Sequence, residues 1–444
     1  MCLSRRDALK AAFSASMLAA FRGRDALAQA GQEILWVQVM ANGGWDQLLF
    51  TDPKQGLRDY GSAVVRQQSG ITYVDFPQVA PFFQAHASRM LVFNGVDTFT
   101  NNHDVGVRHS MSGSMLEGFP VFPAQVAAAL GADRLLPMFT AFDYNEAGGL
   151  IASNPIDWRS TQGFSELKAV ERPPNVYRNP VGSVSESGTP FLPAAVRTRL
   201  DAAHVARTQR LHDAHTLPGH RRGAAQYIRA HAAARRMPEL ELNPMVTLPM
   251  GVSSASRLGQ SMTLGAAAID GFSKGLVTSL LVGLGNFDTH GETDADHLAQ
   301  LQLVFQLTDF LLARAQAANV PMGVVMCSDF GRTVPREGAT GTGHWPISTM
   351  LVVQNDRALA QGRLPGGRVI GGTTGEAAAA NPDPGRVLQA RKVNPATLAF
   401  DDANGIKITP AHVYRLLRRA AGVETASVLR DFPLNIEGND LVVA

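Results

Sequence analysis

Acidic residues and histidines gather where one apolar stretch ends. The segment "FDTHGETDADH", residues 287–297, follows "LVTSLLVGLG" after Asn286, and that apolar stretch is typical of a buried strand. Its ionisable residues are Asp288, His290, Glu292, Asp294, Asp296 and His297. Carboxylates and imidazoles together suit Zn, Mn or Fe, whereas carboxylates alone suit Mg or Ca. The segment therefore indicates a metal or catalytic site, or else only the polar start of a surface helix.

The two interpretations divide this segment. Asp288 and His290 stand at the carboxyl end of the expected strand and are candidate ligands. The pattern Thr293-x-x-Asp296 resembles a helix capping box, with Asp where Glu or Gln is usual. Acidic residues in a first turn also suit the helix dipole. Glu292 and His297 are compatible with either interpretation.

Three further residues could join Asp288 and His290. Asp46 follows the apolar stretch "EILWVQVM", Asp329 follows "VPMGVVMCS", and His344 lies in "GTGHWP". Neighbouring parallel strands lie about 4.8 Å apart, so side chains at their carboxyl ends can converge on an ion. Each residue also has a local interpretation. Asp46 and Asp329 could cap turns, Asp329 with Arg332 as its ion partner, and His344 could be a packed structural histidine.

These residues require a scaffold of buried strands. The apolar segments that predict strands lie in residues 33–46, 89–97, 135–143, 275–288 and 320–329, and each of these ranges ends in Asp. Residues 295–319 have helical apolar spacing between the last two. Strand–helix–strand units of this kind predict an α/β fold, with a mostly parallel central sheet and helices on both faces. In such sheets, sites form beyond the carboxyl ends of strands.

Composition divides the chain into four segments. Residues 1–30 are predicted to be a signal peptide, and residues 31–153 and 246–444 the two parts of the α/β core. Residues 154–245 are expected to be a helical and irregular insertion, a cap rich in arginine: Arg197, Arg199, Arg207, Arg210, Arg221, Arg222, Arg229, Arg235 and Arg236. These arginines either form a solvated helix face or attract an anionic substrate or partner.

The N-terminus predicts export. "SRRDALK" matches the twin-arginine consensus S-R-R-x-F-L-K except at Ala8, and Ala28-Gln29-Ala30 fits a cleavage site. We therefore expect the twin-arginine export machinery as a partner and a periplasmic or secreted location. No segment has the roughly 20 apolar residues that a membrane span needs.

Charge and cysteine content exclude two classes of site. Residues 1–30 carry a net charge of +3 against +2 for the whole chain, so the basic pI belongs partly to the signal and does not indicate nucleic-acid binding. Of the two cysteines, Cys2 lies in the signal. Cys327 alone can form neither an internal disulfide nor a cysteine metal cluster, and its apolar context predicts a buried thiol.

Five motifs together resemble one family. "NGGWDQLLF", "NFDTHGE", "CSDFGRT", "GTGHWP" and "GGRVIGGTTGE" have the order and rough spacing of DUF1501, an uncharacterised, commonly exported bacterial group with an alkaline-phosphatase/sulfatase-like fold. The resemblance spans roughly residues 34–423. It implies a divalent metal (Zn, Mn, Ca or Mg) and, as its ligands, Asp46, Asp288, His290, Asp329 and His344.

Two positions depart from the wider superfamily. Phe330 stands where the superfamily has a ligand histidine after the Asp. His103 begins "HDVGVRHSMSG", where a sulfatase has its nucleophile. His103 could be a metal ligand, a nucleophile or a sign of lost chemistry, and Ser110 and Ser112 are alternative hydroxyls. The ligand role is preferred, with Arg332 or the insertion arginines holding an anionic substrate.

The resemblance leads to two hypotheses of function. One is a periplasmic metal-dependent hydrolase or transferase acting on phosphate, phosphonate or sulfate esters. The other is a non-catalytic exported protein that keeps the fold to bind a glycan, a metal or a partner protein. Loss of a histidine at Phe330 and of a hydroxyl or thiol nucleophile motivates the second.

Overall fold

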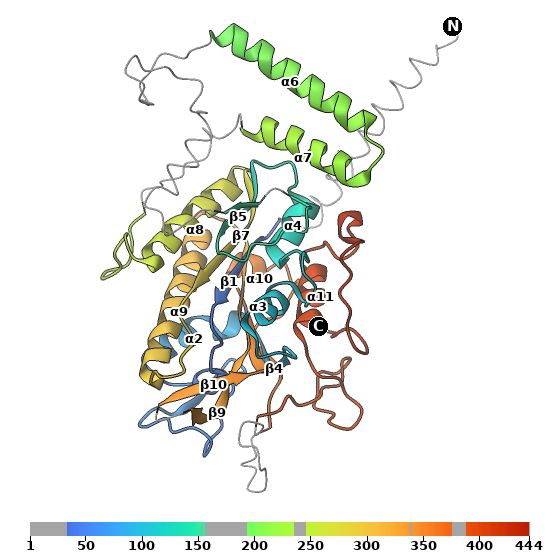
Figure 1. Ribbon diagram of the computed structural model, residues 1–444. Coiled ribbons are helices and arrows are strands. Elements are labelled where there is room, and N and C mark those ends of the chain that lie inside the picture. Colours follow the sequence, from blue (N-terminus) through green and yellow to red (C-terminus); the bar gives the residue numbers. More distant parts are fainter. Residues whose placement is uncertain are drawn as a thin grey trace. The chain divides into compact units, whose positions relative to one another are not determined.

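The computed structural model describes residues 33–151, 153–155, 193–234, 246–337, 340–374 and 388–443 (Figure 1). The predicted signal peptide, Arg235 and Arg236 lie outside these residues. Residues from Leu35 onward form a compact unit of their own, which holds all the helices and strands described below.

An eight-stranded sheet forms the centre of this unit, in the order β12-β4-β11-β8-β1-β7-β5-β6. Its strands, in chain order, are β1 (Leu35–Ala41), β4 (Met90–Asp97), β5 (Leu136–Ala141), β6 (Ser153–Pro155), β7 (Val277–Leu284), β8 (Met322–Ser328), β11 (Ile347–Gln354) and β12 (Arg368–Gly371). Only β11 runs antiparallel to its neighbours. The two sequence segments assigned to the core therefore interleave in one sheet.

The three central strands are buried along their whole length. All residues of β1, β7 and β8 are buried, and the register places Val39 between Val282 and Met326. Continuous apolar strands are expected where helices cover both faces of a parallel sheet. This burial explains why the sequence of these strands is apolar without alternation.

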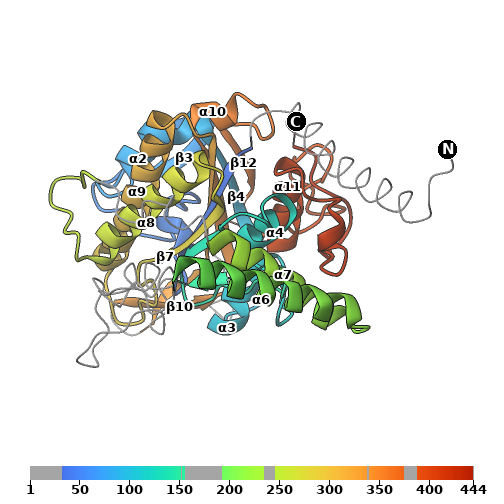
Figure 2. The ribbon, with the colours of Figure 1, turned by 90° about the horizontal axis from the view of Figure 1, so that it is seen from above.

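Helices cover both faces of the sheet (Figure 2). One layer contains α2 (Ala80–His86), α8 (Arg257–Ser273) and α9 (Asp294–Ala317). The other contains α3 (His103–Ser112), α4 (Phe122–Leu130) and α11 (Pro410–Ala420). The α/β fold with a mostly parallel sheet is thus confirmed.

Smaller elements complete the described unit. Two hairpins pair β2 (Val65–Gln68) with β3 (Ile71–Val74) and β9 (Gly331–Glu337) with β10 (Gly341–Trp345), while α10 (Asp356–Leu359) follows β11. In the predicted insertion, α6 (Ala194–Ala214) and α7 (Pro218–Ala234) pack against each other. Short 3-10 helices are η1 (Gln47–Leu49), η2 (Ala87–Arg89) and η6 (Ser427–Leu429). Within the described ranges, no helix has the length and apolar character to cross a membrane.

Local predictions were confirmed at several positions. The five predicted strands correspond to β1, β4, β5, β7 and β8, and the predicted connecting helix is α9. Thr293 and Asp296 form the capping box at the start of α9. Cys327 is buried, and burial raises the pKa of its thiol to about 12.

Candidate metal centre

Two strand ends and two other elements bring ionisable side chains together. After β7 ends at Leu284 the chain continues to Asp288 and His290, and after β8 it continues to Asp329. His103 is the first residue of α3, and His344 lies on β10. The cluster is thus assembled from segments far apart in the sequence.

Three ligand-type atoms form a small triangle at the centre of this cluster. Nε2 of His290 and Nε2 of His344 are 2.8 Å apart. Oδ1 of Asp288 lies 3.0 Å from each of them. His103 adjoins the triangle, with its Nε2 3.5 Å from the other Asp288 oxygen. One ligand atom from each of His103, Asp288 and His344 lies within 4.8 Å of the other two.

Hydrogen bonds behind the imidazoles fix which ring nitrogen faces the triangle. His344 Nδ1 is 3.0 Å from the carbonyl oxygen of Asn101, which can only accept a hydrogen bond. His103 Nδ1 is 2.7 Å from Oδ2 of Asp329, a carboxylate with the same requirement. Each Nδ1 therefore carries the proton in the neutral ring and leaves a lone pair on Nε2, facing the cluster.

Burial and a backbone hydrogen bond fix the carboxylate of Asp329. Its side chain is 0% exposed, and its second oxygen accepts a hydrogen bond of 2.9 Å from the backbone N–H of Gly43. The hydrogen bond to Asp329 raises the pKa of His103. Asp329 is placed to orient His103 rather than to enter the triangle.

The electrostatics of the triangle favour a cation. Partial burial opposes ionisation of Asp288, but hydrogen bonds from the protonated form of His344 and from Arg332 lower its pKa to about 2. Asp288 is therefore a carboxylate near neutral pH. A carboxylate oxygen and two imidazole nitrogens at about 3 Å repel one another unless a proton or a metal ion lies between them.

The cluster is open to solvent on one side. The exposed fractions of the side chains are 38% for His103, 42% for Asp288, 46% for His290 and 20% for His344. The side chains of Asp329 and Arg332, which support these residues, are 0% exposed. A catalytic metal site needs ligands with a solvent-accessible side and a supporting layer behind them, and the cluster meets this requirement.

Arg332 requires a correction of the expected anion-holding role. Its guanidinium donates to the carbonyl oxygens of Gly44, Thr342, Gly43 and Phe287 and to Oδ1 of Asp288. Because this side chain is fully buried and serves backbone carbonyls, it is not available to a substrate. Its contact with Asp288, at 3.0 Å, makes it a positioning residue.

Asp46 is not brought into the cluster. One of its oxygens pairs with Arg58 and the other accepts from the N–H of Leu48, capping η1. Its backbone N–H donates to Nε2 of His297, and Nδ1 of His297 contacts Thr289. Both side chains are buried, so Asp46 and His297 hold the loop after β1 against α9.

The remaining candidates have structural partners. Phe330 is fully buried, and its ring centroid lies 4.9 Å from that of His103 and 4.4 Å from that of His344. Ser110 donates to the carbonyl oxygen of Asp329 and Ser112 to that of Arg108, so neither hydroxyl points into the triangle. The insertion residues Arg199, Arg207, Arg210 and Arg221 are exposed, as expected for a solvated face.

Two supporting positions escaped the sequence analysis. Asn101 acts through its carbonyl oxygen and Gly43 through its N–H, and neither contribution depends on a side chain. Gly43 has φ +115°, and a Cβ there would lie 2.4 Å from the backbone nitrogen of Asp288. The paired glycines in "NGGWD" were the available signal, since a tight approach of two backbones requires glycine.

Comparison with known proteins gives one family. The profile of DUF1501, described as a protein of unknown function, matches residues 35–397. This match covers most of the chain and contains every residue of the cluster. A search of the curated proteins found no match.

Proposed function

The chain belongs to the DUF1501 family, and we propose that it is a metal-dependent hydrolase of anionic esters. The proposed ligands are His103, Asp288, His290 and His344. The proposed substrates are phosphate or sulfate esters, and an alkaline-phosphatase-like arrangement of the sheet is part of the same proposal. Asp46, Asp329 and Arg332 are not assigned as ligands.

The spacing of the side chains fits one ion. Zn–N and Zn–O bonds of about 2.0–2.2 Å put neighbouring ligand atoms roughly 3.0–3.5 Å apart. Within the triangle the separations are 2.8–3.0 Å, and His103 Nε2 lies 3.5 Å from the second Asp288 oxygen. Three imidazoles and one carboxylate favour Zn or Mn over Mg or Ca, which prefer oxygen ligands.

One observation carries the proposal. The ring nitrogens of His103 and His344 that face inward are those whose protons are directed away, to Asp329 and Asn101. A histidine that only stabilises the fold gains nothing from turning a lone pair toward another imidazole and a carboxylate. Metal ligands characteristically have such supporting acceptors.

The residues of the chain have separate roles in this proposal. A divalent metal would supply a Lewis acid that polarises the ester and makes water a better nucleophile. Asp329 holds His103, Asn101 holds His344, and Arg332 holds Asp288. These contacts fix the ligands before substrate arrives, and the exposed faces of His290 and Asp288 leave room for an ester.

The same cluster allows a second function, favoured by Phe330. Phe330 is buried against His103 and stands where the superfamily that the chain resembles has a further ligand histidine, which favours a single ion. A single site without a contacting hydroxyl or thiol among the described residues also suits a protein that binds a metal or a glycan without turnover. Export through the twin-arginine route is part of both proposals.

Metal content and ester cleavage together test the proposal. Full-length protein folded in the cytoplasm would be analysed by mass spectrometry for transition metals and Mg, then assayed with aryl phosphates and aryl sulfates. The hydrolase proposal expects about one metal per chain and turnover that His344→Ala abolishes. A metal-loaded protein that cleaves no ester favours the binding function, and less than about a tenth of an equivalent of metal refutes both metal proposals.

A further inference from the structure

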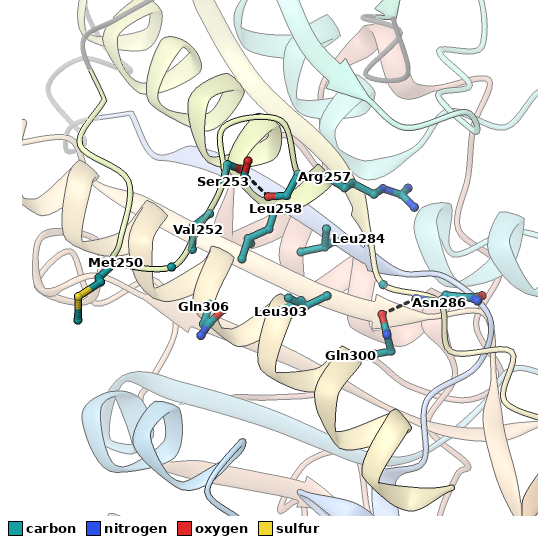
Figure 3. Close-up of a pocket in the computed structure, with 13 residues that line it drawn as sticks. Met250, Val252, Ser253, Arg257, Leu258, Leu284, Asn286, Gln300, Leu303 and Gln306 are labelled. Atoms are coloured by element: carbon teal, nitrogen blue, oxygen red, sulfur yellow. Dashed lines mark hydrogen bonds between the residues drawn. The ribbon is translucent and has the colours of Figure 1, made fainter. Parts of the chain in front are cut away.

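A pocket opens between the start of α8, the middle of α9 and the end of β7 (Figure 3). Its volume of about 520 Å³ lies within the range of small-molecule sites, about 300–1,000 Å³. Val252, Leu258, Leu284 and Leu303 form its apolar wall. Leu258 and Leu284 belong to the main hydrophobic core, and the other two pack against it. The pocket is thus an opening of the core to solvent.

The polar groups of the pocket are amides and hydroxyls. Gln300 and Gln306 flank Leu303 at a spacing of three on α9, and Ser253 lies on the loop before α8. Among the described residues that line the pocket, none is acidic and Arg257 carries the only charge. This lining suits an apolar chain with a neutral or anionic end and disfavours a cation.

The end of β7 connects the pocket to the metal centre. Asn286 lines the pocket, and its backbone N–H donates to Oε1 of Gln300 over 3.0 Å. Asp288 follows two residues later, and two residues span at most about 7 Å. Asn286 and Asp288 are both exposed. Figure 3 shows Asn286 and Met250 at opposite ends of the pocket.

We propose that this pocket holds the aliphatic chain of the substrate, so that the substrates are alkyl phosphate or alkyl sulfate esters. The inference rests on the proposed function and names its substrate class. The ester group lies at the Asn286 end, beside Asp288, and the chain extends along Leu284 and Leu303. Because none of the described lining residues is acidic, no carboxylate of the pocket repels the anionic head group of the substrate.

Calorimetric titration of full-length, zinc-loaded protein with n-alkyl phosphates from ethyl to octyl tests this inference. Each buried methylene is expected to tighten binding about fourfold. Two variants fill the pocket: Leu303→Trp in its wall and Gln306→Trp at its exposed rim. The second keeps the test valid if the first disturbs folding. Both are expected to remove the dependence on chain length and to leave zinc affinity unchanged.

The outcomes separate this inference from the proposed function. If the affinity does not depend on chain length, the assignment of this pocket to the alkyl chain is overturned, whatever the result of the zinc titration. A dependence that survives both tryptophan variants overturns it too, because the chain then binds elsewhere. If the protein does not bind zinc, and its affinity for the esters still increases with chain length, the substrate assignment is overturned together with the hydrolase proposal. Loss of the dependence in both variants, with zinc binding retained, supports the inference.

Discussion

Replacing Asp329 by Asn tests how the supporting layer controls the cluster. The amide keeps the size of the side chain but has one acceptor, whereas Asp329 accepts from both Gly43 N–H and His103 Nδ1. If the amide oxygen faces Gly43, its NH₂ group faces His103 and moves the proton of that ring to Nε2. If the amide is reversed, two N–H donors oppose each other at Gly43.

The reversed amide leaves the buried N–H of Gly43 without an acceptor, at a cost of about 1–3 kcal/mol, whereas the first arrangement puts a proton on the His103 Nε2 that would bind the metal. Loss of a supporting hydrogen bond of this kind typically weakens metal affinity about 10- to 100-fold. Zinc titration of the wild type and Asp329→Asn measures the change. Asp309→Asn is the matched control, because Asp309 also contacts an imidazole, His86 Nε2, over 2.8 Å but outside the cluster. If Asp329→Asn binds zinc as tightly as the wild type and the Asp309→Asn control do, the reasoning is refuted.

Three further predictions concern other parts of the chain. Burial, and then the charges of Arg332 and Arg58, lower the pKa of His297 to about 3. As the pH decreases from about 6.5 to 3, the imidazole therefore takes up a proton in the unfolded chain but not in the folded one. The free energy of unfolding should decrease over this range by at most about 1.4 kcal/mol per pH unit. His297→Gln should flatten this slope in urea melts at pH 6.5 and 5, and equal slopes would contradict the assignment. Gly43→Ala should lower the free energy of unfolding by about 2 kcal/mol or more, because of its φ of +115° and its contact with Asp288; an unchanged urea midpoint would show that the loop relaxes. Replacing Arg5 and Arg6 by Lys should trap the protein in the cytoplasm, as cell fractionation would show, and unchanged export would rule out the twin-arginine route.

The sequence identified the central strands because burial on both faces makes them continuous apolar stretches. It could not identify the outer strand β12, whose residues are mostly half-buried, or the antiparallel course of β11, which depends on pairing with β4 and β8. The capping box of Thr293 depends only on neighbouring residues and could therefore be predicted from the sequence.

The same contrast holds for the cluster. An Asp at a strand end is common to Asp46, Asp288 and Asp329, yet they have three different surroundings. Asp46 is neutralised by Arg58, twelve residues away, and Asp329 points backward to His103. Which distant side chain lies opposite each carboxylate depends on the whole fold, and the local sequence around each Asp does not show it. His103, whose role the sequence left open between ligand, nucleophile and lost chemistry, is held by the buried carboxylate of Asp329.

X-ray absorption on protein loaded with one equivalent of zinc tests the central claim most directly. The account predicts a first shell of nitrogen and oxygen at about 2.0–2.2 Å, with the outer-shell signal of about three imidazoles. His344→Ala should reduce that signal by one imidazole, and His86→Ala should leave it unchanged. A first shell without imidazole, or one that His344→Ala does not alter, would contradict the assignment of the cluster as a metal centre.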